Sequence, residues 1–102
     1  MTLDILPEAQ AELQDSALYF DSLRPSKYDE FMAEWNHGVH AIQANPYQYP
    51  PDEDAPDGLD VRTYLFPRFQ RRIIYQLRDE RIAIVALAHT RKQPGYWHNR
   101  IE

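Results

Sequence analysis

A chain of 102 residues, of which 43% are hydrophobic and 13% aromatic, is long enough to bury one core and too apolar to be disordered. The absence of cysteine excludes disulfides and thiolate metal sites, and no apolar run reaches the length that spans a membrane. The net charge of −5 argues against a nucleic-acid ligand. We therefore expect residues 1–102 to form a single domain of a cytoplasmic protein that has no signal peptide.

The charges are divided unevenly along the chain. Residues 1–61 carry 2 basic and 13 acidic side chains, whereas residues 62–102 carry 9 basic and 3 acidic side chains. This asymmetry predicts one acidic flank and one basic working surface. The alternative is that the two halves neutralise one another across the fold.

The N-terminal segment contains a strand candidate followed by a helix candidate. Leu3–Leu6 is a short apolar segment broken by Asp4, and Pro7 follows where the first turn of a helix tolerates proline. Apolar side chains then recur at helical spacing, at Ala9, Leu13, Ala17 and Phe20. The pattern predicts an amphipathic helix over residues 7–23. Arg24-Pro25 ends it, because the residue before a proline avoids helical backbone angles.

A second helix is predicted between Arg24-Pro25 and Asn45-Pro46. Ser26 is a candidate N-cap, with Asp29 in the capping-box position three residues later. Gly38 interrupts the helical pattern and indicates a position where this helix makes a close contact. The apolar stripe of this helix comprises Tyr28, Phe31, Met32, Trp35, Val39 and Ile42. The two helices should form an antiparallel hairpin with one shared apolar face.

The rest of the chain is predicted to form a loop and three strands. Residues 45–60 contain four prolines, one glycine and a run of acids, which indicates a solvated loop. The strand candidates are Val61–Phe66, Arg71–Arg78 and Ile82–Ala88, with Arg78–Arg81 as the hairpin turn between the last two. Because Ile82–Ala88 is apolar throughout, we expect it to be buried on both faces at the centre of a sheet.

These elements predict an α+β fold. An N-terminal strand and a two-helix hairpin precede a three-stranded antiparallel meander, and the helices cover one face of the sheet. The other face is expected to be partly open and to carry Arg62, Tyr64 and Arg72.

Cations, imidazoles and aromatic rings are concentrated after the last strand. They are His89, Arg91, Lys92, Tyr96, Trp97, His98 and Arg100. Such a cluster predicts a surface that binds phosphates, bases or an acidic partner. The alternative is a C-terminal segment that docks on the sheet, with Tyr96 and Trp97 as packing anchors.

Two further groups of residues are candidate sites. The meander carries Arg62, Arg68, Arg71, Arg72, Arg78 and Arg81, which indicates either an anionic partner or solvated strand edges. His37 and His40 are one helical turn apart, but no third ligand has suitable spacing, so we expect neither a metal site nor a cofactor.

The sequence contains groups that could support cleavage of RNA without a metal. That reaction needs a base, cations around the phosphorane and an acid for the leaving oxygen. His89, Arg62, Arg72, Arg91 and Tyr96 could supply these groups.

The chain resembles the RelE/ParE toxins of type II toxin–antitoxin modules, also known as plasmid stabilisation proteins. Four segments carry the resemblance, in this order: PEAQAELQDSALYF, FMAEWNHGVHAIQANPYQYP, VRTYLFPRFQRRIIYQL and AHTRKQPGYWHNR. The resemblance covers nearly the whole chain and implies the strand, helix, helix and meander order deduced above. It also implies a small toxin that is neutralised by a cognate antitoxin encoded next to it.

The resemblance leaves two targets open. The ending with Pro94, Tyr96 and Trp97 looks closer to the ParE-like branch, which inhibits DNA gyrase and implies no catalysis by the toxin. In that case the target-binding residues are Arg91, Lys92, Tyr96, Trp97 and Arg100. The RelE-like branch cuts mRNA on the ribosome, and there His89, Tyr96, Arg62, Arg72 and Arg91 would be catalytic. The acidic predicted pI of about 5.3 disfavours ribosome binding and leaves a non-toxic remnant, acting only as a binding module, as a further alternative.

Overall fold

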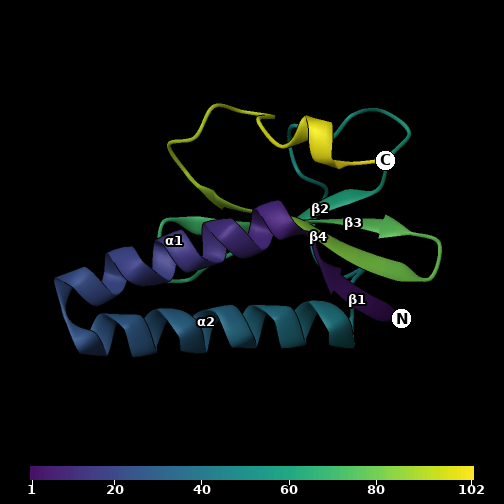
Figure 1. The fold of residues 1–102 in the computed structure, drawn as a ribbon. Coiled ribbons are helices and arrows are strands. Elements are labelled where there is room, and N and C mark those ends of the chain that lie inside the picture. Colours follow the sequence, from purple (N-terminus) through teal and green to yellow (C-terminus); the bar gives the residue numbers. More distant parts are fainter.

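The computed structural model describes residues 1–102 and confirms the predicted α+β order (Figure 1). Its elements are β1 (Thr2–Ile5), α1 (Pro7–Leu23), α2 (Pro25–Ala44), β2 (Val61–Leu65), β3 (Arg71–Arg78), β4 (Arg81–His89) and a short 3-10 helix, η1 (His98–Arg100). Residues 45–60 form neither helix nor strand, apart from one isolated bridge between Pro51 and Arg62.

The four strands form one sheet in the order β1-β4-β3-β2. β2, β3 and β4 are the predicted antiparallel meander, and β1 pairs in parallel with the free side of β4. β4 therefore has a neighbour on each side, and every residue from Ile82 to Ala88 is at most 3% exposed. The prediction of a central strand buried on both faces is confirmed.

A β-bulge on β4 determines which face each side chain of this strand meets. The register passes from Tyr75 opposite Ile84 to Ile74 opposite Ala86, so Val85 is the extra residue. As a result, Val85 and Ala86 both belong to the apolar cluster on one face, and Leu87 belongs to the cluster on the other. The predicted turn between β3 and β4 is also present, with Asp79 at a positive φ of 54° that aspartate tolerates.

The helical hairpin covers one face of the sheet, as predicted. The four α1 residues expected at the core are buried, as are Phe31, Trp35 and Ile42 of α2, whereas Tyr28 is 39% exposed. α2 begins at Pro25 rather than after Ser26, because proline needs no hydrogen-bond acceptor at the first helical position. The predicted Ser26 cap is therefore wrong, and the Ser26 hydroxyl accepts a hydrogen bond from Arg24 Nε at 2.8 Å. Neither helix is long and apolar enough to cross a membrane.

The close contact expected at Gly38 is present, and its partner is the sheet. A Cβ atom at this position would lie 2.8 Å from Tyr64 Cε1 and 3.1 Å from Ile73 Cδ1. Because real Cβ contacts are longer, only glycine lets the helix pack this closely against β2 and β3.

The second face of the sheet is covered, which corrects the expectation of an open face. Ala83, Val85, Ala88 and neighbouring side chains form a second apolar cluster around Trp97, which comes from the C-terminal tail. Figure 1 shows the tail, in yellow, on the side of the sheet away from α2. We use "the tail" for residues 90–102. It closes a small core of its own against β3 and β4.

Two of the three residues expected on an open face lie instead on the helix-covered face. Tyr64 is 6% exposed and belongs to the helix-side cluster. Arg62, opposite Tyr75 in the register, donates from Nη1 to the carbonyls of Tyr47 and Tyr49 at 2.9 Å each. Only Arg72 lies on the face that the tail covers, and its guanidinium is paired with two carboxylates of the 45–60 loop.

Candidate functional site

Most of the charge asymmetry in the sequence is cancelled within the fold. Seven of the eleven Lys and Arg side chains form ion pairs. Five of these seven lie in residues 62–102 and pair with carboxylates of residues 1–61, in the pairs Arg62–Asp60, Arg68–Glu34, Arg72–Asp52, Arg81–Asp4 and Arg100–Glu12. The alternative in which the two halves neutralise one another therefore accounts for most of the basic residues. The predicted basic working surface is reduced to the cations that have no ion pair.

The acidic loop takes part in this cancellation instead of being wholly solvated. Asp52 is 5% exposed, and its Oδ1 lies 3.3 Å from Arg72 Nε. Its Oδ2 accepts a hydrogen bond from the Asp54 amide at 3.0 Å, and the Asp54 carboxylate lies 3.8 Å from Arg72 Nη2. The loop thus buries one carboxylate against the sheet and neutralises one of the expected cations.

Glu12 on α1 anchors the tail at Tyr96 and Arg100. Its carboxylate accepts hydrogen bonds from Tyr96 Oη at 2.7 Å, from Arg100 Nη1 at 2.8 Å and from the Leu87 amide at 3.1 Å. Arg100 Nη1 also donates to the Val85 carbonyl at 3.0 Å. One carboxylate therefore joins α1, β4 and the tail, and burial together with the bond to Glu12 raises the pKa of Tyr96.

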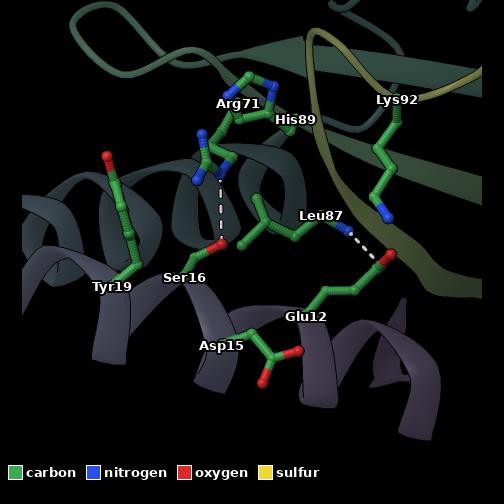
Figure 2. A pocket seen from close by; sticks show the side chains of 8 residues that line it. All are labelled: Glu12, Asp15, Ser16, Tyr19, Arg71, Leu87, His89 and Lys92. Carbon is green, nitrogen blue, oxygen red and sulfur yellow. Dashed lines mark hydrogen bonds between the residues drawn. The ribbon is translucent and has the colours of Figure 1, made fainter.

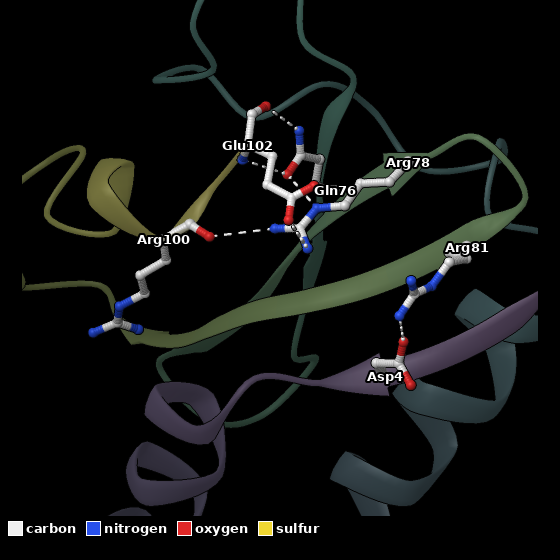
Figure 3. A network of polar contacts seen from close by, with 6 residues as sticks. All are labelled: Asp4, Gln76, Arg78, Arg81, Arg100 and Glu102. Atoms are coloured by element: carbon white, nitrogen blue, oxygen red, sulfur yellow. Dashed lines mark hydrogen bonds and ion pairs between the residues drawn. The ribbon is translucent and has the colours of Figure 1, made fainter.

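The end of the tail is attached to β3 by a second polar network (Figure 3). Gln76 Nε2 donates to the Glu102 carbonyl at 2.9 Å, and the Glu102 amide donates to Gln76 Oε1 at 3.1 Å. Arg78 contacts the same segment, with Nη2 donating to the Arg100 carbonyl at 3.3 Å and Nη1 lying 3.5 Å from the Glu102 carboxylate. Arg81 and Asp4 form a separate pair that ties β4 to β1.

Three of the five expected target-binding residues therefore have structural partners. Trp97 is fully buried in the second cluster, which corrects its placement on a contact surface and favours the alternative of a packing anchor. Tyr96 and Arg100 are partly buried and engaged with Glu12. Arg91 and Lys92 remain: both are exposed, and neither forms an ion pair.

His89 lies at the end of β4, beside Arg91 and Lys92, in a cleft of about 270 Å³ against α1 (Figure 2). The cleft is lined by Glu12, Asp15, Ser16, Tyr19, Arg71, Leu87, His89 and Lys92. His89 Nδ1 accepts a hydrogen bond from the Arg91 amide at 2.9 Å, which leaves the other ring nitrogen to carry the proton in the neutral form. Burial lowers the pKa of His89, and the nearby charges of Arg71, Arg91 and Lys92 lower it further.

The five candidate nuclease residues do not meet in one cleft. Arg62 and Arg72 lie on opposite faces of the sheet, and each has a carboxylate partner, Asp60 and Asp52 respectively. The Tyr96 hydroxyl is directed to Glu12, and only His89 and Arg91 lie together. His37 and His40 are exposed on α2, and no group of three His, Cys, Asp or Glu side chains is placed to hold a metal ion.

Two residues that shape the site were not singled out from the sequence. Glu12 lies between the buried Ala9 and Ser16 on the edge of the apolar stripe of α1, a position that gives no sign of its partners. Arg71 was counted only as one of six meander arginines, yet it is 9% exposed and pairs with His89 across the β3–β4 register. Nothing in the sequence around Arg71 distinguishes it from the neighbouring Arg72.

The N-terminal strand, the helical hairpin and the meander have the order that the sequence resemblance implied. A chain of a solved structure described as the chromosomal ParDE TA system from P. aeruginosa has the same fold, with a TM-score of 0.73 over 87% of this chain and 95% of that chain. The two sequences are 20% identical, so this similarity is one of fold. No protein-family model matches the sequence, and no curated protein matches it.

Proposed function

We propose that this protein is the toxin of a type II toxin–antitoxin module and that it inhibits DNA gyrase by binding. The supporting observation is the fold shared with a chain of the ParDE system over nearly the full length of both chains. The C-terminal sequence features that resemble the ParE-like branch favour gyrase as the target.

The surface that would contact gyrase contains fewer residues than the five expected from the sequence. Arg91 and Lys92 are its exposed and unpaired cations, beside His89 at the end of β4. Tyr96, Trp97 and Arg100 position this segment from behind, through Glu12 and the second apolar cluster. A surface whose supporting residues are already in place loses less entropy when it binds.

We expect Arg91→Ala combined with Lys92→Ala to weaken gyrase inhibition without unfolding the chain, because both side chains are exposed and neither forms an ion pair. In a supercoiling assay with purified gyrase, the concentration that gives half inhibition should rise about tenfold or more, equivalent to about 1.4 kcal/mol. Arg24→Ala is the matched control, since Arg24 is also exposed and has no ion pair but lies at the helical turn.

The target itself is tested by inducing the wild-type chain alone in a bacterial host. Incorporation of thymidine should fall before incorporation of amino acids. The reverse order would contradict the gyrase proposal and favour cleavage of mRNA. Inhibition that is unchanged in the Arg91/Lys92 double variant would contradict only the assignment of the surface.

The proposal includes a cognate antitoxin encoded next to the toxin. The purified chain should form a tight complex with the product of the adjacent open reading frame, detectable by co-purification and calorimetry. A neighbouring protein that does not bind would count against the whole assignment, whatever the target.

The geometry supports the nuclease alternative less well. Metal-free cleavage requires a base, an acid and cations around one phosphate. Arg62 and Arg72 are on opposite faces of the sheet, and the Tyr96 hydroxyl donates to Glu12, so these groups are not assembled around a common space.

A further inference from the structure

We propose that the cleft between α1 and the end of β4 binds a carboxylate group, presented by an acidic side chain of a protein partner. The pocket is the cleft of Figure 2, with Arg71 as its central residue. This inference does not depend on gyrase being the target.

Arg71 is a buried cation without an anion. It is 9% exposed, yet no carboxylate forms an ion pair with it. Its guanidinium lies against the Phe20 ring at 5.2 Å, while Nε donates to Ser16 Oγ and Nη1 to the Gln70 carbonyl, each at 3.2 Å. A buried charge is costly unless it is paired, so an anion in this cleft would relieve that cost.

The guanidinium has donors left for such an anion. Arginine carries five N–H groups, and the bonds to Ser16 and Gln70 involve Nε and Nη1 only. Nη2 donates no hydrogen bond within the chain, and it is not fully buried. An anion in the cleft can therefore reach it. A planar guanidinium with free donors suits a carboxylate.

Lys92 adds a second cation on the Arg71 side of the cleft, and the His89 ring lies on the same side. His89 faces Arg71 across the β3–β4 register, and Lys92 comes from the start of the tail. Figure 2 shows Arg71, His89 and Lys92 along one side of the cleft and Glu12 and Asp15 on α1 along the other. Of the four Lys and Arg residues without an ion pair, three (Arg71, Arg91 and Lys92) lie at or beside this cleft, and the fourth is Arg24.

The two acids on α1 favour a carboxylate over a phosphate. Glu12 and Asp15 line the same cleft, and repulsion from them rises with the charge of the ligand. A carboxylate carries one negative charge, whereas a phosphate group carries up to two near neutral pH.

The surroundings of the cleft favour a protein as the source of the carboxylate. A neighbouring hollow of about 350 Å³ shares Tyr19, Arg71 and His89 with the cleft and extends it toward Leu23 and Phe69. Tyr19 and Leu23 are 55% and 56% exposed. A partner segment with an acidic side chain next to an apolar one would meet both features at once.

The test is an NMR titration of the full chain with sodium acetate and, separately, with sodium phosphate, near neutral pH and with sodium chloride adjusted to constant ionic strength. Acetate should cause saturable shifts of the Arg71 Nε–H and of the Ser16 and His89 amides. Phosphate should bind these groups more weakly. Arg71→Met should raise the acetate concentration at half-saturation by about tenfold or more.

Lys92→Ala should weaken acetate binding as well, and it is the second variant because its side chain is exposed and forms no ion pair. Arg24→Met is the control, since Arg24 has no ion pair and lines neither the cleft nor the neighbouring hollow, so the titration should be unchanged. The proposal is overturned if acetate causes no saturable shifts, or if the shifts persist equally in Arg71→Met and Lys92→Ala. Tighter binding of phosphate than of acetate would overturn the assignment to a carboxylate.

Discussion

At the scale of single residues, the partners of each charged side chain determine what it does. Arg100 and Arg91 look equivalent in the sequence, yet Arg100 is bound by Glu12 and Val85 whereas Arg91 is free. A substitution of Arg100 would therefore loosen the attachment of the tail as well as remove a charge. Arg91 is the better residue for testing a binding surface without disturbing the fold.

His89 provides a pH-dependent prediction at this scale. Burial and the charges of Arg71, Arg91 and Lys92 hold its pKa below the ordinary value of 6.5, and the acids Glu12 and Asp15 line the same cleft. An NMR titration of the His89 ring should therefore give a midpoint below 6.5. Arg91→Ala and Lys92→Ala should each raise that midpoint, because each removes a positive charge near the ring.

The same shift affects folding stability. As the pH falls, the unfolded chain takes up the His89 proton before the folded chain does. The contribution of neutral His89 to the free energy of unfolding is therefore complete above pH 6.5. It is lost as the pH falls from 6.5 through the lower pKa of the folded state. His89→Gln should therefore reduce the loss of unfolding free energy on acidification. A midpoint at or above 6.5 in the wild-type chain would contradict this account.

At the scale of elements, the tail acts as a cover for the sheet rather than as a free arm. The helical hairpin buries one face of the sheet, and Trp97 with its neighbours buries the other. Glu12 anchors the tail near Tyr96 and Arg100, and Gln76 with Arg78 anchors its last residues. The exposed Arg91 and Lys92 are held between these anchors and the end of β4.

Trp97→Ala should lower the free energy of unfolding by about 3–5 kcal/mol, because it empties the centre of the second cluster. Trp97→Phe should cost clearly less, since Trp97 Nε1 donates no hydrogen bond that phenylalanine would lose. Urea unfolding followed by circular dichroism measures both. Equal costs for the two variants would indicate that the indole nitrogen has a partner, such as an ordered water.

At the scale of the whole molecule, cancellation of charge limits what the protein can bind. The net charge is −5, and only four cations lack ion pairs. Affinity for nucleic acids depends on the number of phosphates that free cations neutralise. A surface with so few free cations suits a protein target better than a polyanion.

We therefore expect no measurable binding of the chain to a single-stranded RNA oligonucleotide at physiological ionic strength. Fluorescence anisotropy with a labelled oligonucleotide is the measurement. A variant with Asp52→Asn and Asp54→Asn, which frees Arg72, should bind RNA better than the wild type. Tight binding by the wild type would contradict this prediction and favour the nuclease alternative.

The sequence alone was sufficient for the elements and their order. The helical spacing from Ala9 to Phe20, the apolar run Ile82–Ala88 and the turn at Asp79 are all local patterns, and all three were predicted correctly. Backbone preference and periodicity act over a few residues, so they can be deduced from neighbours in the chain. The start of α2 was misplaced by a local rule as well, because Pro25 begins the helix where a cap at Ser26 was expected.

Only the tertiary structure decided which charges remain free and which face of the sheet is covered. Glu12 and Arg100 are separated by 88 positions, and no local pattern links them. The bulge at Val85 and the burial of Trp97 likewise depend on how distant segments pack. Ion pairs and packing require approach in space, whereas the sequence specifies only proximity along the chain. The elements could therefore be predicted, but the reduction of the basic surface to Arg91, Lys92 and the Arg71 cleft could not.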